Sequence, residues 1–248
     1  VYKRQVLLGF LRKGSADLLG KVLGMPDEIE SAILTFVESI KDDSTIPCDV
    51  ILATDAAGDT KPRHFVGYGG AEIFGRIPHF TENRYIKYYK GILSQLFGDL
   101  GPFTTGMALA LLEKLIKAPF RRKRAWKIHV DGQVVSEGAY QALIVVNGYL
   151  GPDLPYSSEP LGSGSIYLFA LKDIGLRKLL AQAKRARDGS IMDDPEKWGM
   201  ETFASSESLE LEPSGAAPFP INVDGATKHC QTGAQFRIVD QIRLISRD

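Results

Sequence analysis

The sequence predicts an α+β chain: a β-sandwich-like domain with inserted helices over residues 44–248, preceded over residues 6–43 by the last strand and helices of an α/β domain. Two observations predict this division. Before residue 42 the apolar residues recur at helical spacing, whereas later apolar runs are mostly short and separated by glycine turns. The polar stretch Lys-Asp-Asp-Ser-Thr at 41–45 lies between the two patterns, and we expect the domain boundary there.

The first five residues, Val-Tyr-Lys-Arg-Gln, are set apart from this fold. They can be back-translated as GTG TAT AAG AGA CAG, which resembles the inner end of a transposase sequencing adaptor read in frame. Such scars belong outside fold reasoning, so we interpret residues 1–5 as non-native. The alternative is an ordinary polar entry to a strand.

The first part should contain one strand and two helices. The apolar run at 6–11 ends at a glycine turn, as a buried strand does, and a helix is expected to follow it. Gly24 and Pro26 should end that helix. A second helix is expected at 27–41 on the apolar stripe Ile29, Ile33, Phe36, Val37 and Ile40.

The second part should be mostly strands, because its apolar runs are bounded by turns such as Asp131-Gly132, Asp224-Gly225 and Thr232-Gly233. The expected strands are 48–53, 64–68, 125–130, 140–147, 165–171, 208–212, 219–223 and 235–245. Helices are expected at 84–95, 106–117 and 172–187.

Composition excludes several classes of protein. Thirty basic and thirty acidic residues give zero formal net charge, so no overall field attracts nucleic acid. Two cysteines are too few for a disulfide framework and fit a reducing compartment. No apolar run approaches the ~20 residues of a membrane span, and we expect a cytoplasmic protein.

Two motifs near opposite ends of the chain resemble those of the diacylglycerol kinase superfamily, which includes bacterial lipid kinases and the sphingosine and ceramide kinases. One is Gly14-Ser15-Ala16-Asp17-Leu-Leu; the other is Asp224-Gly225-Ala226 after the apolar strand at 219–223. The resemblance covers nearly the whole chain in order. It identifies residues 6–43 as the C-terminal remnant of a nucleotide-binding domain, and it implies ATP and Mg²⁺ as cofactors.

The resemblance also implies roles for individual residues. Asp224 would be the general base on a lipid hydroxyl, and Ser15, with Gly14 and Asp17, would contact the nucleotide. Each role has a structural alternative. Ser15 is equally suited to be a helix N-cap, Asp17 to hold the turn, and Asp-Gly is the commonest short hairpin signal.

Three further positions resemble family segments on the substrate side. Gly69 and Glu72 belong to a glycine-rich segment that ends in an acid, and Asn147 ends a buried strand. Glycines of this kind permit close approach either to another strand or to substrate. A tyrosine-rich helix near 85–91 completes the resemblance.

Several departures from the family pattern predict an inactive fragment. Ser163 replaces an acid of the family's magnesium loop, and Ala226 replaces the Glu of Asp-Gly-Glu. The family's Gly-Gly-Asp-Gly-Thr phosphate loop occurs nowhere in the chain. We therefore expect truncation at the N-terminus and no catalysis by the chain as given.

One dense basic cluster has two interpretations. It consists of Lys114, Lys117, Arg121, Arg122, Lys123 and Arg124, with Phe120 and Trp126 beside it. In a lipid kinase such a cluster can bind anionic headgroups during peripheral membrane contact. The alternative is a solvated loop between a helix and a strand.

Three functions remain open from the sequence. The preferred one is a fragment of an ATP-dependent kinase for a diacylglycerol- or sphingoid-like lipid. The second is a non-catalytic lipid-binding or regulatory relative, and the third is an NAD kinase, which shares the two-domain plan. Apolar helix faces within 14–41 should be exposed in the chain as given, and we expect aggregation or a homodimer.

Overall fold

The computed structural model describes residues 7–10, 18–58, 61–81, 101–117, 124–215 and 217–247. The strands are β1 (Leu7–Leu8), β2 (Thr45–Asp55), β3 (Arg63–Phe65), β4 (Tyr68–Glu72), β5 (Ala125–Val130), β6 (Gln133–Val146), β7 (Ile166–Lys172), β8 (Met200–Ser205), β9 (Leu209–Pro213), β10 (Phe219–Val223), β11 (Ala226–Cys230) and β12 (Ala234–Ile245). The helices are α1 (Leu18–Val22), α2 (Ile29–Lys41), α3 (Ile73–Thr81), α5 (Gly101–Lys117), α6 (Leu176–Asp188), the 3-10 turn η1 (Ser190–Asp193) and α7 (Pro195–Trp198).

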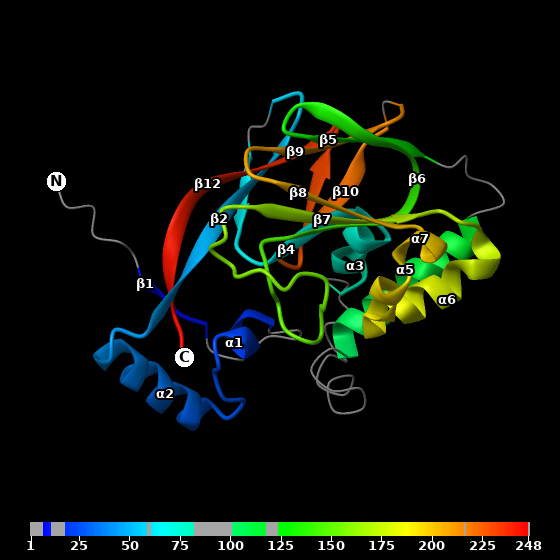
Figure 1. The fold of residues 1–248 in the computed structure, drawn as a ribbon. Coiled ribbons are helices and arrows are strands. Elements are labelled where there is room, and N and C mark those ends of the chain that lie inside the picture. Colours follow the sequence, from blue (N-terminus) through cyan, green and yellow to red (C-terminus); the bar gives the residue numbers. More distant parts are fainter. Residues whose placement is uncertain are drawn as a thin grey trace.

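The strands form one mostly antiparallel, nearly closed sheet (Figure 1). Its order is β11-β10-β4-β6-β5-β9-β12-β2-β3, with β7 pairing β6 and β8, and β1 joining β12 in parallel. The expected α+β chain with a β-rich main part is confirmed. The division into two domains stays a prediction.

The sheet bends sharply at strand β6, whose two halves pair with different strands. Its first half pairs with β5, and its second half pairs with β4 and β7. A register shift between Tyr140 and Ala142 leaves Gln141 as an extra residue, and such a bulge bends a strand. The two halves of the sheet therefore enclose a common interior.

That interior holds the largest buried side chains of the described chain. Trp126, Phe219 and Phe236 are each at most 2% exposed, and the rings of Trp126 and Phe219 meet edge to face at 5.0 Å. Leu143 from β6 and Leu211 from β9 pack between them from opposite halves of the sheet. Removal of this apolar surface from water is the main force that holds the halves together.

A second apolar layer covers the outer face of β4, β6 and β7. Phe74 and Ile77 of α3 pack there against Ile144 of β6, and Leu18 of α1 joins the same cluster. Helices α3, α5 and α6 then pack on one another at one end of the molecule (Figure 1). Helices α3, α5 and α6 therefore lie outside the interior that the two halves of the sheet enclose.

Two expected strands, 125–130 and 219–223, are confirmed to the residue as β5 and β10. The expected single strand at 64–68 is wrong: it is two strands, β3 and β4, separated at Val66 and Gly67. The helix expected at 84–95 lies outside the described residues.

Helix α3 was not expected from the sequence, because it contains Gly75 and Pro78. Gly75 is needed there: a Cβ on it would lie 2.5 Å from the carbonyl oxygen of Pro220 in β10. Tertiary packing against β10 thus overrides the poor intrinsic helix propensity of this segment.

Helix α2 exposes most of its apolar stripe, as the sequence predicts. Of this stripe, Ile33, Val37 and Ile40 are 46%, 42% and 47% exposed, and Leu34 beside it is 65% exposed. Within the described residues, no helix is long and apolar enough to cross a membrane.

The first prediction concerns this exposed stripe. We expect the chain to self-associate through α2, and Val37→Glu to weaken association at least about tenfold, because the partly exposed side chain then resists burial. Sedimentation velocity over a concentration series measures the effect. Val134→Glu on β6, where Val134 is 56% exposed, is the matched control. A wild-type chain that stays monomeric at all concentrations would contradict the prediction.

Candidate functional site

Asp224 lies at the tip of the hairpin formed by β10 and β11. Val223 pairs with Ala226, so Asp224 and Gly225 form a two-residue loop. Both have positive φ, 44° and 83°, as a type I′ turn requires. The amide N–H of Gly225 donates to Oδ1 of Asn222 at 2.8 Å and braces the turn.

The carboxylate of Asp224 binds three consecutive backbone N–H groups, those of Val66, Gly67 and Tyr68, which we call the Val66–Tyr68 segment. Oδ2 accepts from Val66 at 3.0 Å, and Oδ1 accepts from Tyr68 at 2.8 Å. The N–H of Gly67 lies 3.1 Å from Oδ1 and 3.3 Å from Oδ2. These bonds draw the segment away from strand pairing and explain why β3 and β4 are separate.

Asn147 holds the same segment through its carbonyl groups. Its side chain is fully buried, and Nδ2 donates to the carbonyl oxygens of Val66 at 2.8 Å and Asp49 at 2.7 Å. Its backbone N–H donates to the carbonyl oxygen of Gly67 at 3.0 Å. Asp224 therefore binds the N–H groups of the Val66–Tyr68 segment, and Asn147 binds its carbonyl groups. The sequence did not predict this arrangement.

The charge of Asp224 affects the pKa values of neighbouring side chains. Asp224 is an exposed residue, yet protein atoms crowd its carboxylate; this crowding raises its pKa, while the three N–H donations oppose the shift. Burial raises the pKa of Cys48 to about 12, and Asp49 and Asp224 add to it. Burial also raises the pKa of Tyr68, again with a contribution from Asp224.

Glycines allow the strands to approach closely around this site. A Cβ on Gly67 would lie 2.7 Å from Oδ1 of Asp224 and 3.7 Å from Cδ1 of Leu19 in α1. Gly70, with φ of 148°, would place a Cβ 2.0 Å from the carbonyl oxygen of Leu143. Gly69 is buried, and a Cβ on it would lie 2.9 Å from the carbonyl oxygen of Asn222. In this structure Gly69 makes close contact with another strand, one of the two uses that the sequence allowed.

Glu72 lies at the other end of β4 from Asp224. Glu72 is four positions after Tyr68, or about 13 Å along an extended strand. Its Oε1 accepts from Nε1 of Trp126 at 2.9 Å, and its Oε2 lies 3.6 Å from Nζ of Lys114. The structure therefore brings Asp224, Gly69 and Asn147 to one end of β4 and places Glu72 at the other.

In the loop that resembles the family's magnesium loop, Ser163 and Gly164 make hydrogen bonds to other groups of the protein. Oγ of Ser163 accepts from the hydroxyl of Tyr167 at 3.0 Å, and the N–H of Gly164 donates to Oδ2 of Asp49 at 2.7 Å. Oδ1 of Asp49 accepts from Nε2 of Gln241 at 2.9 Å, so both oxygens of this buried acid are engaged. Among the residues that the structure describes, no group of three or more His, Cys, Asp or Glu side chains can hold a metal. Magnesium as a cofactor stays a prediction.

The predicted nucleotide residues Gly14, Ser15 and Asp17 lie outside the described residues. The basic cluster is described only in part. Lys114 pairs with Glu72, and the guanidinium of Arg124 lies 5.8 Å and 5.5 Å from the ring centres of Trp126 and Phe219. These two members make internal contacts, and both interpretations of the cluster stay predictions, because Arg121, Arg122 and Lys123 lie outside the described residues.

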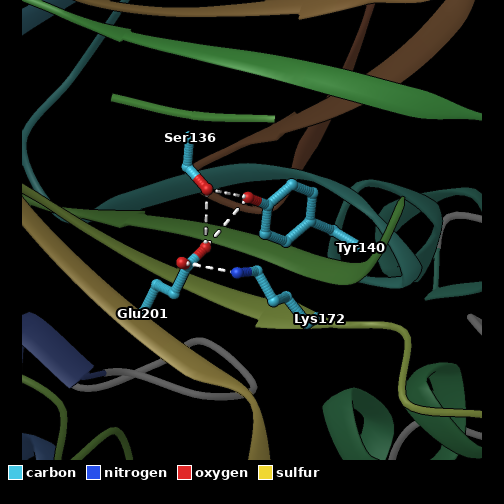
Figure 2. Close-up of polar contacts among 4 residues, drawn as sticks. All are labelled: Ser136, Tyr140, Lys172 and Glu201. Carbon is cyan, nitrogen blue, oxygen red and sulfur yellow. Dashed lines mark hydrogen bonds and ion pairs between the residues drawn. The ribbon is translucent and has the colours of Figure 1, made fainter. Parts of the chain in front are cut away.

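A second polar cluster lies on β6, β7 and β8 (Figure 2). Oε2 of Glu201 accepts from the hydroxyls of Ser136 and Tyr140, each at 2.9 Å, and Oε1 accepts from Nζ of Lys172 at 2.7 Å. Burial raises the pKa of Tyr140 to about 12. Partial burial disfavours the ionised form of Glu201 and by itself would raise its pKa. The hydrogen bonds that Lys172, Tyr140 and Ser136 donate outweigh this effect, so the pKa of Glu201 lies below its ordinary value. Every member has a partner, so the cluster joins three strands.

Comparisons with known proteins identify the fold. No protein-family model matches the chain, and no curated protein matches its sequence. Three solved structures of proteins named as diacylglycerol kinases from Bacillus anthracis strain Sterne do match. Their TM-scores are 0.60, 0.55 and 0.57 at 19%, 16% and 18% identity. The matches cover 98%, 97% and 97% of this chain and 69%, 66% and 69% of the respective neighbours. The resemblance drawn from the sequence is therefore confirmed for the fold, and the chain spans about two thirds of each neighbour's length.

The second prediction tests the contact between Gly67 and Asp224. Gly67→Ala should lower the free energy of unfolding by about 1–3 kcal/mol, because the new methyl group displaces the carboxylate from its three N–H donors. Urea denaturation measures the change. Gly138→Ala is the control, since a Cβ on Gly138 meets nothing within 4 Å. Equal stability of the two variants would contradict the prediction.

The third prediction concerns Glu201. A depressed folded-state pKa stabilises the fold above the unfolded pKa of about 4.3, and this stabilisation is lost as the pH falls through the lower folded value. Glu201→Gln should therefore destabilise the protein by about 1–2 kcal/mol at pH 7, and the difference from wild type should shrink below about pH 4. Denaturation across pH measures this, with exposed Glu137→Gln as control. A difference that does not change with pH would argue against the charge.

Proposed function

We propose that this chain is the acceptor side of an ATP-dependent lipid kinase, in which a lipid hydroxyl is phosphorylated next to Asp224. The observation that carries the proposal is the fold, which matches diacylglycerol kinase structures over 97–98% of the chain. Asp224 supports it as a carboxylate that three backbone N–H groups hold at the tip of a hairpin turn. A diacylglycerol- or sphingoid-like alcohol is the proposed substrate class.

The hydrogen bonds of Asp224 suit a proton acceptor. An ionised carboxylate offers about four lone-pair positions, and the carboxylate of Asp224 accepts from three backbone N–H groups, of which that of Gly67 is shared between Oδ1 and Oδ2. We propose that a substrate hydroxyl donates to the same carboxylate. Crowding raises the pKa of Asp224 and makes it a stronger base than a free aspartate, while the fixed N–H donors hold its orientation.

In this mechanism Asp224 would take the proton of the acceptor hydroxyl as the hydroxyl oxygen forms a bond to the γ-phosphorus of ATP. The bond between the γ-phosphorus and the β–γ bridging oxygen would break, and ADP would leave. We propose Gly14, Ser15 and Asp17 as the nucleotide-contacting residues, with Ser15 donating its hydroxyl. Leu19, four residues after Ser15, lies close to the position of Gly67, so α1 borders the Asp224 turn.

We further propose that the 248 residues alone do not transfer phosphate. They contain no Gly-Gly-Asp-Gly-Thr loop, and the described residues include no group of three or more His, Cys, Asp or Glu side chains that could hold a metal. About a third of each structural neighbour has no counterpart in this chain. The phosphate-binding elements would then come from residues beyond these 248.

The second candidate is a non-catalytic lipid-binding relative. It is favoured by Ala226 and Ser163, which stand where the family has acids, and by Asp49, whose two oxygens are occupied within the fold. In that case Asp224 would serve only to hold the Val66–Tyr68 segment.

The fourth prediction separates these candidates. DNA upstream of codon 1 is read first, and the longest continuous chain is then assayed with labelled ATP and diacylglycerol or sphingosine in mixed micelles. The kinase proposal expects transfer by the longer chain and none by the 248 residues. A longer chain that binds these lipids without phosphorylating any of them would establish the non-catalytic candidate.

The fifth prediction tests whether Asp224 acts as the catalytic base or only holds the Val66–Tyr68 segment in place. Asp224→Asn should lower kcat at least about 100-fold, because the amide cannot accept the proton. Asn147→Ala loosens the same Val66–Tyr68 segment but leaves the carboxylate, and should lower kcat less than about tenfold. Equal losses in the two variants would assign Asp224 a positioning role only.

The pH profile provides an independent readout of the same role. A base works only when deprotonated, so kcat/KM should rise with pH through the pKa of Asp224, above the ordinary aspartate value of about 3.9, and then level off. This rise of kcat/KM at acidic pH should remain in the Asn147→Ala variant. If it also remains in the Asp224→Asn variant, it is due to the titration of another group.

A further inference from the structure

A polar side chain is completely buried at the bend of β6. Gln141 is 0% exposed, and neither Nε2 nor Oε1 of its amide has a hydrogen-bond partner among the described residues. An amide group carries two N–H donors on its nitrogen and two lone pairs on its oxygen. Gln141 therefore has both donors and an acceptor available inside the protein.

The bulge of β6 sets this residue apart from its neighbours. Tyr140 pairs with Lys172 of β7 and Ala142 pairs with Leu171, so no residue of β7 lies opposite Gln141. Tyr140 packs in the apolar interior, whereas Ala142 packs in the apolar layer outside it. Gln141 thus lies where the strand passes from one apolar cluster to the other. Bulges are over-represented next to active sites, where they redirect a side chain.

Burial of the Gln141 amide destabilises the fold unless another molecule binds to it. A buried donor or acceptor without a partner loses its hydrogen bonds to water and gains none in return. A methionine would fill a similar volume without that loss. In folded proteins such groups are ordinarily satisfied by an ordered water or another bound molecule. The buried amide therefore indicates an occupant at the bend.

The charged residues beside the bend indicate that this occupant is neutral. Nζ of Lys114 donates to the carbonyl oxygen of Tyr140 at 3.4 Å and lies 3.6 Å from Oε2 of Glu72. Lys172, opposite Tyr140, pairs with Glu201 at 2.7 Å. Each of these two described pairs has zero net charge, so neither favours an ion over a neutral molecule.

A hydroxyl group matches both atoms of the amide. Its oxygen accepts a hydrogen bond from Nε2 and its proton is donated to Oε1, whereas a carbonyl group only accepts and an ammonium group only donates. We propose that the bend of β6 is a binding site for a small neutral molecule with a hydroxyl group, either water or an alcohol, which Gln141 holds by these two hydrogen bonds.

The proposed site is separate from the Asp224 turn. Ala142, next to Gln141, pairs with Glu72 at the end of β4 that lies away from Asp224. Tyr68, whose N–H binds Asp224, pairs instead with Val146 at the other end of β4. The proposal goes beyond the lipid kinase function and does not depend on it, because a chain without kinase activity would bury the same amide.

The test is proton NMR of the isotopically labelled chain, in which the side-chain amide signals of Gln141 are assigned by their loss in Gln141→Met. Without added alcohol, we expect rotating-frame Overhauser contacts from water to these protons, with the sign that distinguishes bound water from proton exchange. Contacts from added glycerol in place of water would identify an alcohol as the occupant. The amide of Asn222 is the control, because it is equally buried but bonded within the protein. Its Oδ1 accepts from the N–H of Gly225 at 2.8 Å and its Nδ2 lies 3.5 Å from the carbonyl oxygen of Phe74, so neither contact is expected there.

Thermal unfolding gives a second, independent measure. If a bound molecule satisfies the amide, Gln141→Met removes its hydrogen bonds and should lower the melting temperature by at least about 2 °C. Gln133→Met, at an exposed position on the same strand, should change it by less than about 1 °C. Two results would overturn the proposal. One is the absence of contacts from both water and glycerol at Gln141, and the other is a higher melting temperature in Gln141→Met than in wild type, which would show that the amide is buried without an occupant.

Discussion

The capture of the Val66–Tyr68 segment by Asp224 is the contact on which the local architecture depends. Three amide groups that a continuous strand would use for pairing are bound instead by one carboxylate from a hairpin far along the chain. Asn147 holds the carbonyl groups of the same segment. Because these polar groups need partners, the interruption between β3 and β4 is stable rather than strained.

The rest of the fold places the two holding residues within reach of that segment. The bulge at Gln141 turns β6 from one half of the sheet to the other, and Asn147 follows directly after its end. Gly69 and Gly70 let β4 lie tightly between β6 and β10, so the β10–β11 hairpin brings Asp224 to the start of β4. The packing between the halves of the sheet thereby determines the geometry of the turn.

Local sequence signals predicted several strands and hairpin turns, because alternation, glycine turns and apolar runs act over a few residues, but β8 and β11 were not expected. The strand 219–223 and the Asp224-Gly225 turn are examples. The break at Val66–Gly67 was not predictable, since it depends on a side chain more than 150 residues away. Helix α3 was missed for the same reason: Gly75 and Pro78 argue against a helix until the contact with β10 is known. Asp49 left a signal, a lone acid in a buried apolar run, which points to a satisfied buried carboxylate.

The carboxylate of Asp224 has consequences for reading related sequences. It holds the backbone whether or not a substrate is present, so a protein that has lost the chemistry still needs an aspartate there to keep its shape. An aspartate at this position in a related sequence is therefore accounted for by the turn alone, and it is not by itself evidence of phosphoryl transfer.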